Sequence, residues 1–179
     1  MRGLIRQWML KPQDIAVAFK LLSIDGAKPS FKQLGKQLRL SQFEVHAAFN
    51  RLQLSKLLSA MDGRPIASRF ADFICFGAIY SYPAIRSELT IGVATAHAAM
   101  PLSGEILSSS NSPPVWPYPA GKTQGEGLLP LYQNLPEAAL EDLRMYEFLA
   151  LFDALRIGQA RERNLAAAMM RARIDQFGA

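Results

Sequence analysis

The chain has 179 residues, half of them hydrophobic, and a formal net charge of +5 at pH 7. This length allows one good hydrophobic core, or one core with a small appendage. No run approaches the roughly 18 to 20 consecutive apolar residues that span a bilayer, and Lys11, Gln13 and Asp14 interrupt the first apolar stretch too early for a signal peptide. The single cysteine, Cys75, excludes an intrachain disulfide. We therefore expect a cytoplasmic protein with Cys75 as an inert core residue.

The first predicted helix begins near Pro12, since proline favours the first turn of a helix. Apolar residues recur at helical spacing as far as Leu22, and Asp25-Gly26 mark the end. We expect this helix to pack across the next two helices and to complete a three-helix core.

A helix-turn-helix is predicted next. Ser30 with Gln33, and Ser41 with Glu44, have the spacing of capping boxes, so two helices begin 11 residues apart. Only a tight turn fits between them, and Gly35, which lacks a side chain, allows the helices to cross closely. The second helix presents a buried stripe made of Val45, Ala48, Phe49 and Leu52. Such an arrangement holds a recognition helix out for the major groove of DNA.

Positive charge is concentrated in the same part of the chain. Residues 1–60 contain ten Lys or Arg and three acidic residues, a net charge of +7, whereas the remainder carries −2. A surface that faces DNA phosphates requires such a concentration of positive charge. Caps and apolar spacing alone also suit an αα-hairpin that binds no nucleic acid, and a basic face is often only solvated. The position of the charge favours DNA binding.

Two sets of side chains are candidates for contacting DNA. The first set faces away from the apolar stripe and could read bases: Gln42, Phe43, His46, Ala47 and Asn50. Glutamine and asparagine pair bidentately with adenine, while phenylalanine and alanine contact the thymine methyl group. His46 is equally compatible with a solvated surface histidine, and Phe43 with a local core residue. The second set could contact phosphates: Lys32, Lys36, Arg39, Arg51 and Arg86.

Residues 12–58 resemble the DNA-binding core of bacterial winged-helix regulators of the MarR type. The whole chain, including GVATAHAAMPL at 92–102 and VWPYPAGKTQGEGLLPLY at 115–132, is similar to a family of small bacterial helix-turn-helix regulators. This resemblance implies a winged-helix fold and a regulatory role. Arg39 departs from it, because such motifs usually have glycine in the turn. A left-handed backbone at Arg39 would cost on the order of 1 kcal/mol. A further helix before the wing is the second departure.

That further helix is predicted from Ile66 to Gly77, after a turn at 61–65. Residues 78–82 and 89–93 then alternate with period two and predict a β-hairpin. We interpret this hairpin as the wing, with Arg86 near its tip. An irregular strand pair that covers the core explains the same pattern.

In the rest of the chain the amino-acid composition, and the structure that it predicts, changes twice. Residues 101–135 are rich in Pro, Ser and Gly and predict a loop or strap, with a mobile serine stretch at 108–112 and an apolar part at 116–132 pinned over the core. Residues 136–179 predict a helical hairpin broken at Gly158. The second of these helices has the stripe Leu165, Ala168, Met169 and Ala172. The stripe suits a homodimer interface or contact with the chain's own core.

No catalytic or metal-binding motif is found. His46 and His97, with one cysteine, make no credible zinc site. Gly121-Lys122-Thr123 lacks the leading glycine of a phosphate loop, because that position is Trp116. We therefore predict no cofactor and no enzymatic activity.

Together these observations predict a mainly α fold: a winged helix-turn-helix domain over 1–100 with a three-helix core and a short β-hairpin, the strap over 101–135, and a C-terminal helical region over 136–179. The predicted function is sequence-specific regulation of transcription, as a repressor that binds duplex DNA as a homodimer; the sequence specifies no effector. The alternative is a protein-interaction module, such as an antitoxin-like partner of a neighbouring gene product, with weak or absent DNA affinity.

Overall fold

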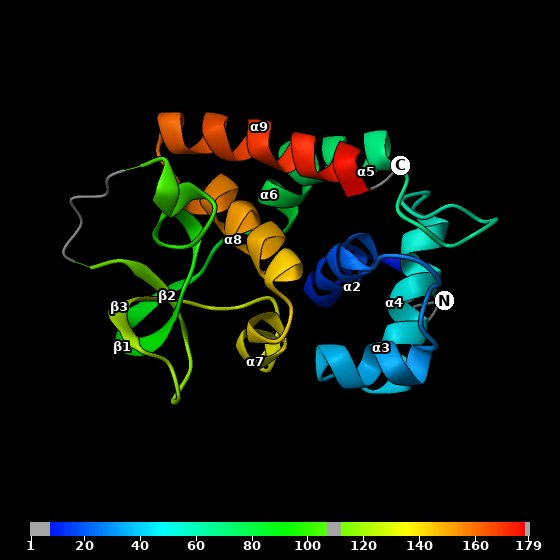
Figure 1. Cartoon of the computed structure of the whole chain (residues 1–179), viewed down its shortest axis with the longest axis horizontal. Helices are drawn as coiled ribbons and strands as arrows, with labels where there is room; N and C mark the ends of the chain where they lie inside the picture. Colours follow the sequence, from blue (N-terminus) through cyan, green and yellow to red (C-terminus); the bar gives the residue numbers. More distant parts are fainter. Residues whose placement is uncertain (1–7, 107–111, 178–179) are drawn as a thin grey trace.

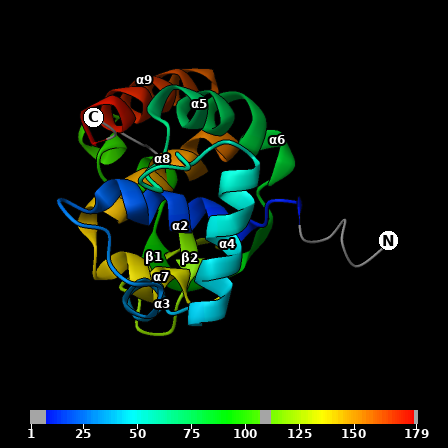
Figure 2. The same ribbon diagram turned by 90° about the vertical axis from the view of Figure 1, so that its right-hand side faces the viewer.

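The computed structural model describes residues 8–106 and 112–177, and Figures 1 and 2 show the arrangement of its elements. The serine stretch predicted to be mobile lies almost wholly outside these residues. In chain order the elements are α2 (Pro12–Ser23), α3 (Phe31–Leu38), α4 (Gln42–Leu54), α5 (Ala67–Asp72), the π-helical turn η1 (Phe73–Ala78), α6 (Ile79–Ser81), β1 (Arg86–Ala94), the 3₁₀ turns η2 (Ala96–Ala98) and η3 (Leu102–Gly104), β2 (Pro114–Pro117), β3 (Thr123–Leu128), α7 (Leu135–Leu140), α8 (Leu143–Ile157) and α9 (Ala160–Phe177). No described helix is both long and apolar enough to cross a membrane.

Both predicted capping boxes are present in the helix-turn-helix. The Ser30 hydroxyl accepts from the Gln33 N–H at 3.3 Å, and the Gln33 side chain accepts from the Ser30 N–H at 2.9 Å. The same reciprocal bonds join Ser41 and Glu44 at 3.2 and 2.8 Å. Each box satisfies backbone donors that a helix start otherwise leaves unpaired. Local sequence therefore places the starts of α3 and α4.

The turn between α3 and α4 depends on two unusual residues. Arg39 ends α3 in the left-handed conformation, with φ of 54°. Gly35 lies so close to the start of α4 that an added Cβ would be 2.7 Å from the Leu40 carbonyl oxygen. The expected close crossing at Gly35 is confirmed. The left-handed backbone conformation of the turn, which is strained for any residue with a side chain, is adopted by Arg39.

A single hydrophobic core joins the N-terminal helices to the C-terminal ones. Phe19 of α2 is fully buried, stacks on Phe148 of α8 at 5.2 Å between centroids, and meets Phe70 and Phe152 edge-on at 5.5 and 6.3 Å. Burial of one such side chain contributes about 1.5–3 kcal/mol. Figure 1 shows α8 between α2 and α9, so α8 is the central element of the fold.

The prediction that residues 78–82 and 89–93 form a wing is wrong. Residues 78–81, expected to be a strand, continue the helical segment begun by α5. Ile74 and Ala78, four residues apart on one helical face, are both fully buried, whereas the Tyr80 side chain is 80% exposed. The apparent alternation in this segment thus coincides with one turn of a helix that packs on the core. The winged helix-turn-helix prediction fails because the hairpin's first strand does not exist.

The strand that does form, β1, pairs with segments from the predicted strap. It is antiparallel to β2, with Val93 opposite Trp116, and antiparallel to β3, with Thr90 opposite Gly125. Strands β2 and β3 pair in parallel, so all three close on one another. Gly92 permits this closure, since a Cβ there would be 2.0 Å from the Trp116 carbonyl oxygen. The sheet is mixed and is built from residues far apart in sequence.

The small sheet is anchored to α8 through Asp153. Trp116 is 1% exposed, and its indole N–H donates to the Asp153 carboxylate at 2.7 Å. The Thr95 hydroxyl donates to the same oxygen at 2.7 Å, and Arg156 donates to the other oxygen. The expectation that the apolar part of the strap is pinned over the core is confirmed at Trp116.

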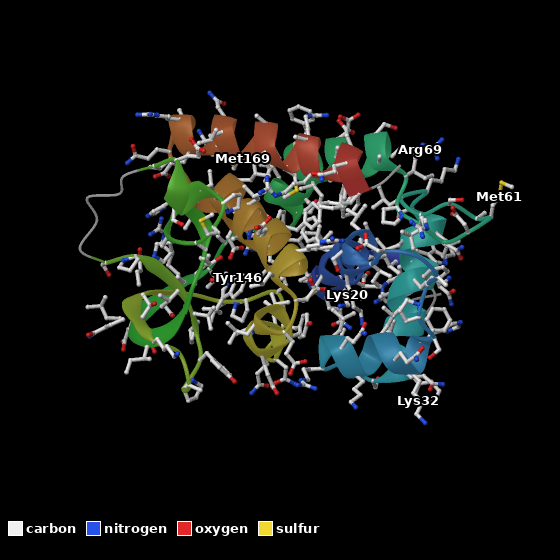
Figure 3. The ribbon with its side chains drawn as sticks, in the orientation of Figure 1. Lys20, Lys32, Met61, Arg69, Tyr146 and Met169 are labelled. Carbon is white, nitrogen blue, oxygen red and sulfur yellow. The ribbon has the colours of Figure 1, made fainter. Side chains whose placement is uncertain are left out.

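The C-terminal helical hairpin is present, with Gly158 ending α8 as predicted. In α9 the buried residues are Ala166, Met170 and Ile174. The stripe predicted for dimerisation is rotated away from this face: Ala168 and Ala172 are exposed, while Leu165 and Met169, the latter labelled in Figure 3, are half-buried. Helix α9 therefore folds onto its own core, and its use in a homodimer stays a prediction.

Candidate nucleic-acid interface

Helix α4 presents its predicted outer face to solvent. Gln42, Phe43, His46 and Asn50 are exposed and Ala47 is half-buried. The expected inward stripe, Val45, Ala48, Phe49 and Leu52, is buried. Figure 2 shows α4 across the front of the molecule, with the N-terminal part of the helix beside α3. The five candidate base-reading residues therefore lie along one accessible helix.

Two aromatic contacts define this surface more closely. Phe43 is 80% exposed, so it is not a local core residue. His46 meets Phe31 edge-on, with ring centroids 5.1 Å apart, and Phe31 in turn contacts Phe49 at 5.3 Å. This contact orients the His46 ring although its surface remains open.

Lys32 and Lys36 occupy one face of α3, and both are exposed. Their spacing of four residues places them one helical turn apart. In Figure 3, Lys32 projects away from the body of the molecule. Within the described residues neither lysine forms an ion pair, so both are available to an external anion.

Arg51, a predicted phosphate contact, is instead buried. Its Nε and Nη2 atoms donate to Asp14 Oδ2 and Oδ1 at 2.7 and 2.6 Å. Asp14 is fully buried, and its Oδ2 also accepts from the Lys11 N–H that begins α2. This pair fastens α4 to α2 and holds the Arg51 guanidinium in the interior, away from the surface that would face DNA. The partners are 37 residues apart, so sequence spacing did not indicate the pairing.

Arg39 and Arg86, the other arginine candidates, are also paired. Arg39 contacts Glu137 at 3.1 Å and Glu141 at 2.5 Å, which fastens the turn of the helix-turn-helix to α7. Arg86 opens β1, rather than lying at a wing tip, and pairs with Glu126 across the sheet. Figure 1 shows β1 and α4 at opposite ends of the molecule. Arg86 is therefore not brought to the recognition helix.

These pairs reduce the positive charge that the sequence count suggested. Lys20, Arg39 and Arg51 all face acidic partners. The exposed lysines of this region that form no ion pair within the described chain are Lys11, Lys28, Lys32, Lys36 and Lys56. Sequence analysis did not single out Lys28, whose ammonium lies over the Phe49 ring at 4.1 Å; its spacing of four from Lys32 was the available signal.

Glu44 is the acidic residue at the start of α4. The Ser41 N–H, followed by the Ser41 hydroxyl, holds the pKa of Glu44 below its ordinary value. The carboxylate is thus engaged in capping and stabilised as an anion near the helix N-terminus.

No metal centre that could support catalysis is found in the described residues. They contain no group of three or more His, Cys, Asp or Glu side chains that could hold a metal ion. Cys75 is buried, as expected, and burial raises the pKa of its thiol, so it is a poor nucleophile.

No protein-family model matches the chain, and comparisons with curated proteins and with solved structures gave no match. The resemblance of residues 12–58 to MarR-type regulators thus stays a prediction. Interpretation of the surface depends on the geometry of α3 and α4 alone.

Proposed function

We propose that the protein binds duplex DNA through the helix-turn-helix of α3 and α4 and regulates transcription by occupying its site. The observation that carries this proposal is the exposed outer face of α4, with Gln42, His46 and Asn50 open to solvent beside the lysines of α3.

In this proposal α4 enters the major groove and α3 lies across the phosphate backbone. The side chains of Gln42 and Asn50 offer paired amide groups to adenine edges, and Phe43 offers an apolar surface to a thymine methyl group. Lys32 and Lys36 neutralise phosphates and position the helix without reading sequence. Two copies related by a two-fold axis would present two such helices to half-sites about 34–36 Å apart.

A mobility-shift assay against the DNA upstream of the protein's own gene tests the proposal. Binding should be selective over shuffled DNA and should weaken steeply between 50 and 200 mM salt, because phosphate contacts release counterions. Absence of selective binding at both salt concentrations would overturn the proposal.

Paired variants separate base reading from phosphate contact. Asn50→Ala should lose about 1–3 kcal/mol of binding to the cognate site and relax sequence preference. Asn164→Ala, an exposed asparagine on α9, is the matched control and should bind normally. Lys36→Ala should weaken binding to all duplexes and flatten the salt dependence, whereas Lys122→Ala in an exposed loop should not.

The exposure of Phe43 favours a second candidate function, a protein-interaction surface on α4. Phe43→Ser separates the two. Under the DNA proposal it weakens binding to sites containing the read thymine and leaves non-specific DNA binding unchanged. Loss of a co-purifying protein without any change in DNA binding would favour the interaction module.

A further inference from the structure

Two basic side chains line one small hollow close to α4. Lys28 comes from the chain between α2 and α3, and Arg64 comes from the chain between α4 and α5; Leu21, Ile24 and Gly26 complete the lining. The hollow has a volume of about 10 Å³, which is about the space that one water molecule needs. In Figure 1 both connecting segments lie at the end of the molecule that α4 occupies. The hollow therefore lies next to the candidate nucleic-acid interface.

Contacts on two sides position the Lys28 ammonium. It lies 4.1 Å from the centre of the Phe49 ring of α4 and 5.8 Å from the centre of the Phe31 ring. A Cβ added to Gly63 would be 2.8 Å from Lys28 Nζ, so the ammonium also lies directly against the chain that leads into Arg64. The aromatic faces attract the cation without neutralising its charge.

Arg64 is positioned by its own segment and by Gly26. The segment 57–66 turns back on itself, and the Ser59 N–H donates to the Arg64 carbonyl oxygen at 2.8 Å. Arg64 Nη2 donates to the Gly26 carbonyl oxygen at 2.5 Å, on the other wall of the hollow. A guanidinium has five N–H donors, and this bond uses one of them.

Acidic side chains do not neutralise these two cations. In the part of the chain that the structure describes, neither Lys28 nor Arg64 forms an ion pair. Asp25, three residues before Lys28, pairs with Arg144 at 2.6 Å. Asp62 Oδ1 accepts from the backbone N–H of Arg64 at 3.1 Å, not from its guanidinium. Two cations that line one hollow repel each other, and an anion held by both would remove this repulsion.

We propose that Lys28 and Arg64 form a binding site for one phosphate group. The hollow has room for a single phosphate oxygen, while the other oxygens of the group remain in solvent. The guanidinium donates charge-assisted hydrogen bonds to the group, and the ammonium adds a second positive charge.

The source of the phosphate rests on the proposed function: it is the backbone of a duplex bound by α4. Because the hollow encloses so little of the group, free phosphate binds weakly, whereas a duplex already held by α4 presents its phosphates at high effective concentration. Lys28 and Arg64 thus extend the phosphate contacts beyond Lys32 and Lys36 of α3.

An NMR titration of the full chain with inorganic phosphate, at constant ionic strength, tests the site without DNA. We expect saturable shifts of the Arg64 Nε–H and of the Gly63 backbone amide. The Gly63 shift should disappear in Lys28→Gln and persist in the control Lys122→Gln, since Lys122 is exposed in a distant loop. Shifts that do not saturate, or a Gly63 shift that survives in Lys28→Gln, would overturn the site.

Duplex binding between 50 and 200 mM salt tests the source. Lys28→Gln and Arg64→Gln should each reduce the slope of log affinity against log salt by about 1, on cognate and shuffled DNA alike. Arg163→Gln, at an exposed arginine of α9, is the control and should keep the native slope. Native slopes in both variants would overturn the duplex as the source and leave the proposed function intact. Absence of duplex binding by the native chain would contradict the proposed function and the duplex source together, and the phosphate titration then decides the site by itself.

Discussion

The helix-turn-helix and the three-stranded sheet differ in where their stabilising contacts come from. In the first, Ser30 and Ser41 cap their helices by accepting from backbone N–H groups three positions along the chain. In the second, Val93 pairs with Trp116, and Trp116 then bonds to Asp153. Short-range contacts can be read from spacing, whereas the sheet depends on which distant segments meet. The same chain thus contains one region that sequence patterns predict well and one that they predict poorly.

Removal of the buried ion pair between Asp14 and Arg51 should cause the largest loss of stability, and it acts on the helix-turn-helix. Asp14→Ala leaves Arg51 charged and unpaired and should lower the free energy of unfolding by about 3–5 kcal/mol. Urea denaturation followed by circular dichroism measures this loss. Asp25→Ala is the control, because Asp25 pairs with Arg144 at 2.6 Å on the surface and should cost about 1 kcal/mol or less. Similar losses in the two variants would show that the Asp14 pair does not fasten α4.

A methyl group at Gly35 tests the turn itself. Gly35→Ala places a Cβ 2.7 Å from the Leu40 carbonyl oxygen, a backbone atom that cannot rotate away. We expect a destabilisation of about 1–3 kcal/mol in thermal or urea unfolding, from forced separation of α3 and α4. Gly104→Ala is the control, because its nearest neighbour would be the Met100 sulfur at 3.7 Å. A neutral Gly35→Ala would mean that the helices do not cross closely.

Trp116→Phe tests the long-range anchor of the sheet. It keeps an aromatic ring but removes the indole donor to Asp153, which should cost about 1–3 kcal/mol. Chemical denaturation monitored by far-UV circular dichroism gives the loss. If the sheet and the helix-turn-helix share one core, the variant should still unfold in a single transition. Two separate transitions would show that they are independent units.

The smallest loss of stability is expected where the start of α8 meets α2, and it should depend on pH. Burial raises the pKa of Asp142, but hydrogen bonds from Lys20, the Met145 N–H and Ser23 outweigh it and hold that pKa below 3.8. A lowered folded-state pKa stabilises the protein above 3.8, and the stabilisation is lost as pH falls through the folded value. Asp142→Asn should therefore be less stable than the native chain at pH 7, with a difference that shrinks in acid. A difference independent of pH would contradict this assignment.

The candidate DNA surface was predictable where it depends on helical periodicity. The outward positions of Gln42, His46 and Asn50 follow from the buried stripe on the same helix. The arginine assignments were less successful: Arg51 meets Asp14, and Arg39 meets Glu137 on α7 and Glu141 directly after it, more than 90 residues further along. A sequence shows how many charges a segment carries, but their availability depends on acidic residues brought near by folding.

By itself the sequence determined the starts of α3 and α4, the inward face of α4, the break at Gly158 and the predominance of helix, because these depend on interactions within a few residues of the chain. Tertiary structure alone decided that residues 78–81 are helical, that the predicted strap supplies β2 and β3, and that Arg51 is buried. These outcomes depend on which surfaces exclude water and pair hydrogen bonds across long sequence separations, and burial against the central helix α8 outweighs local preference.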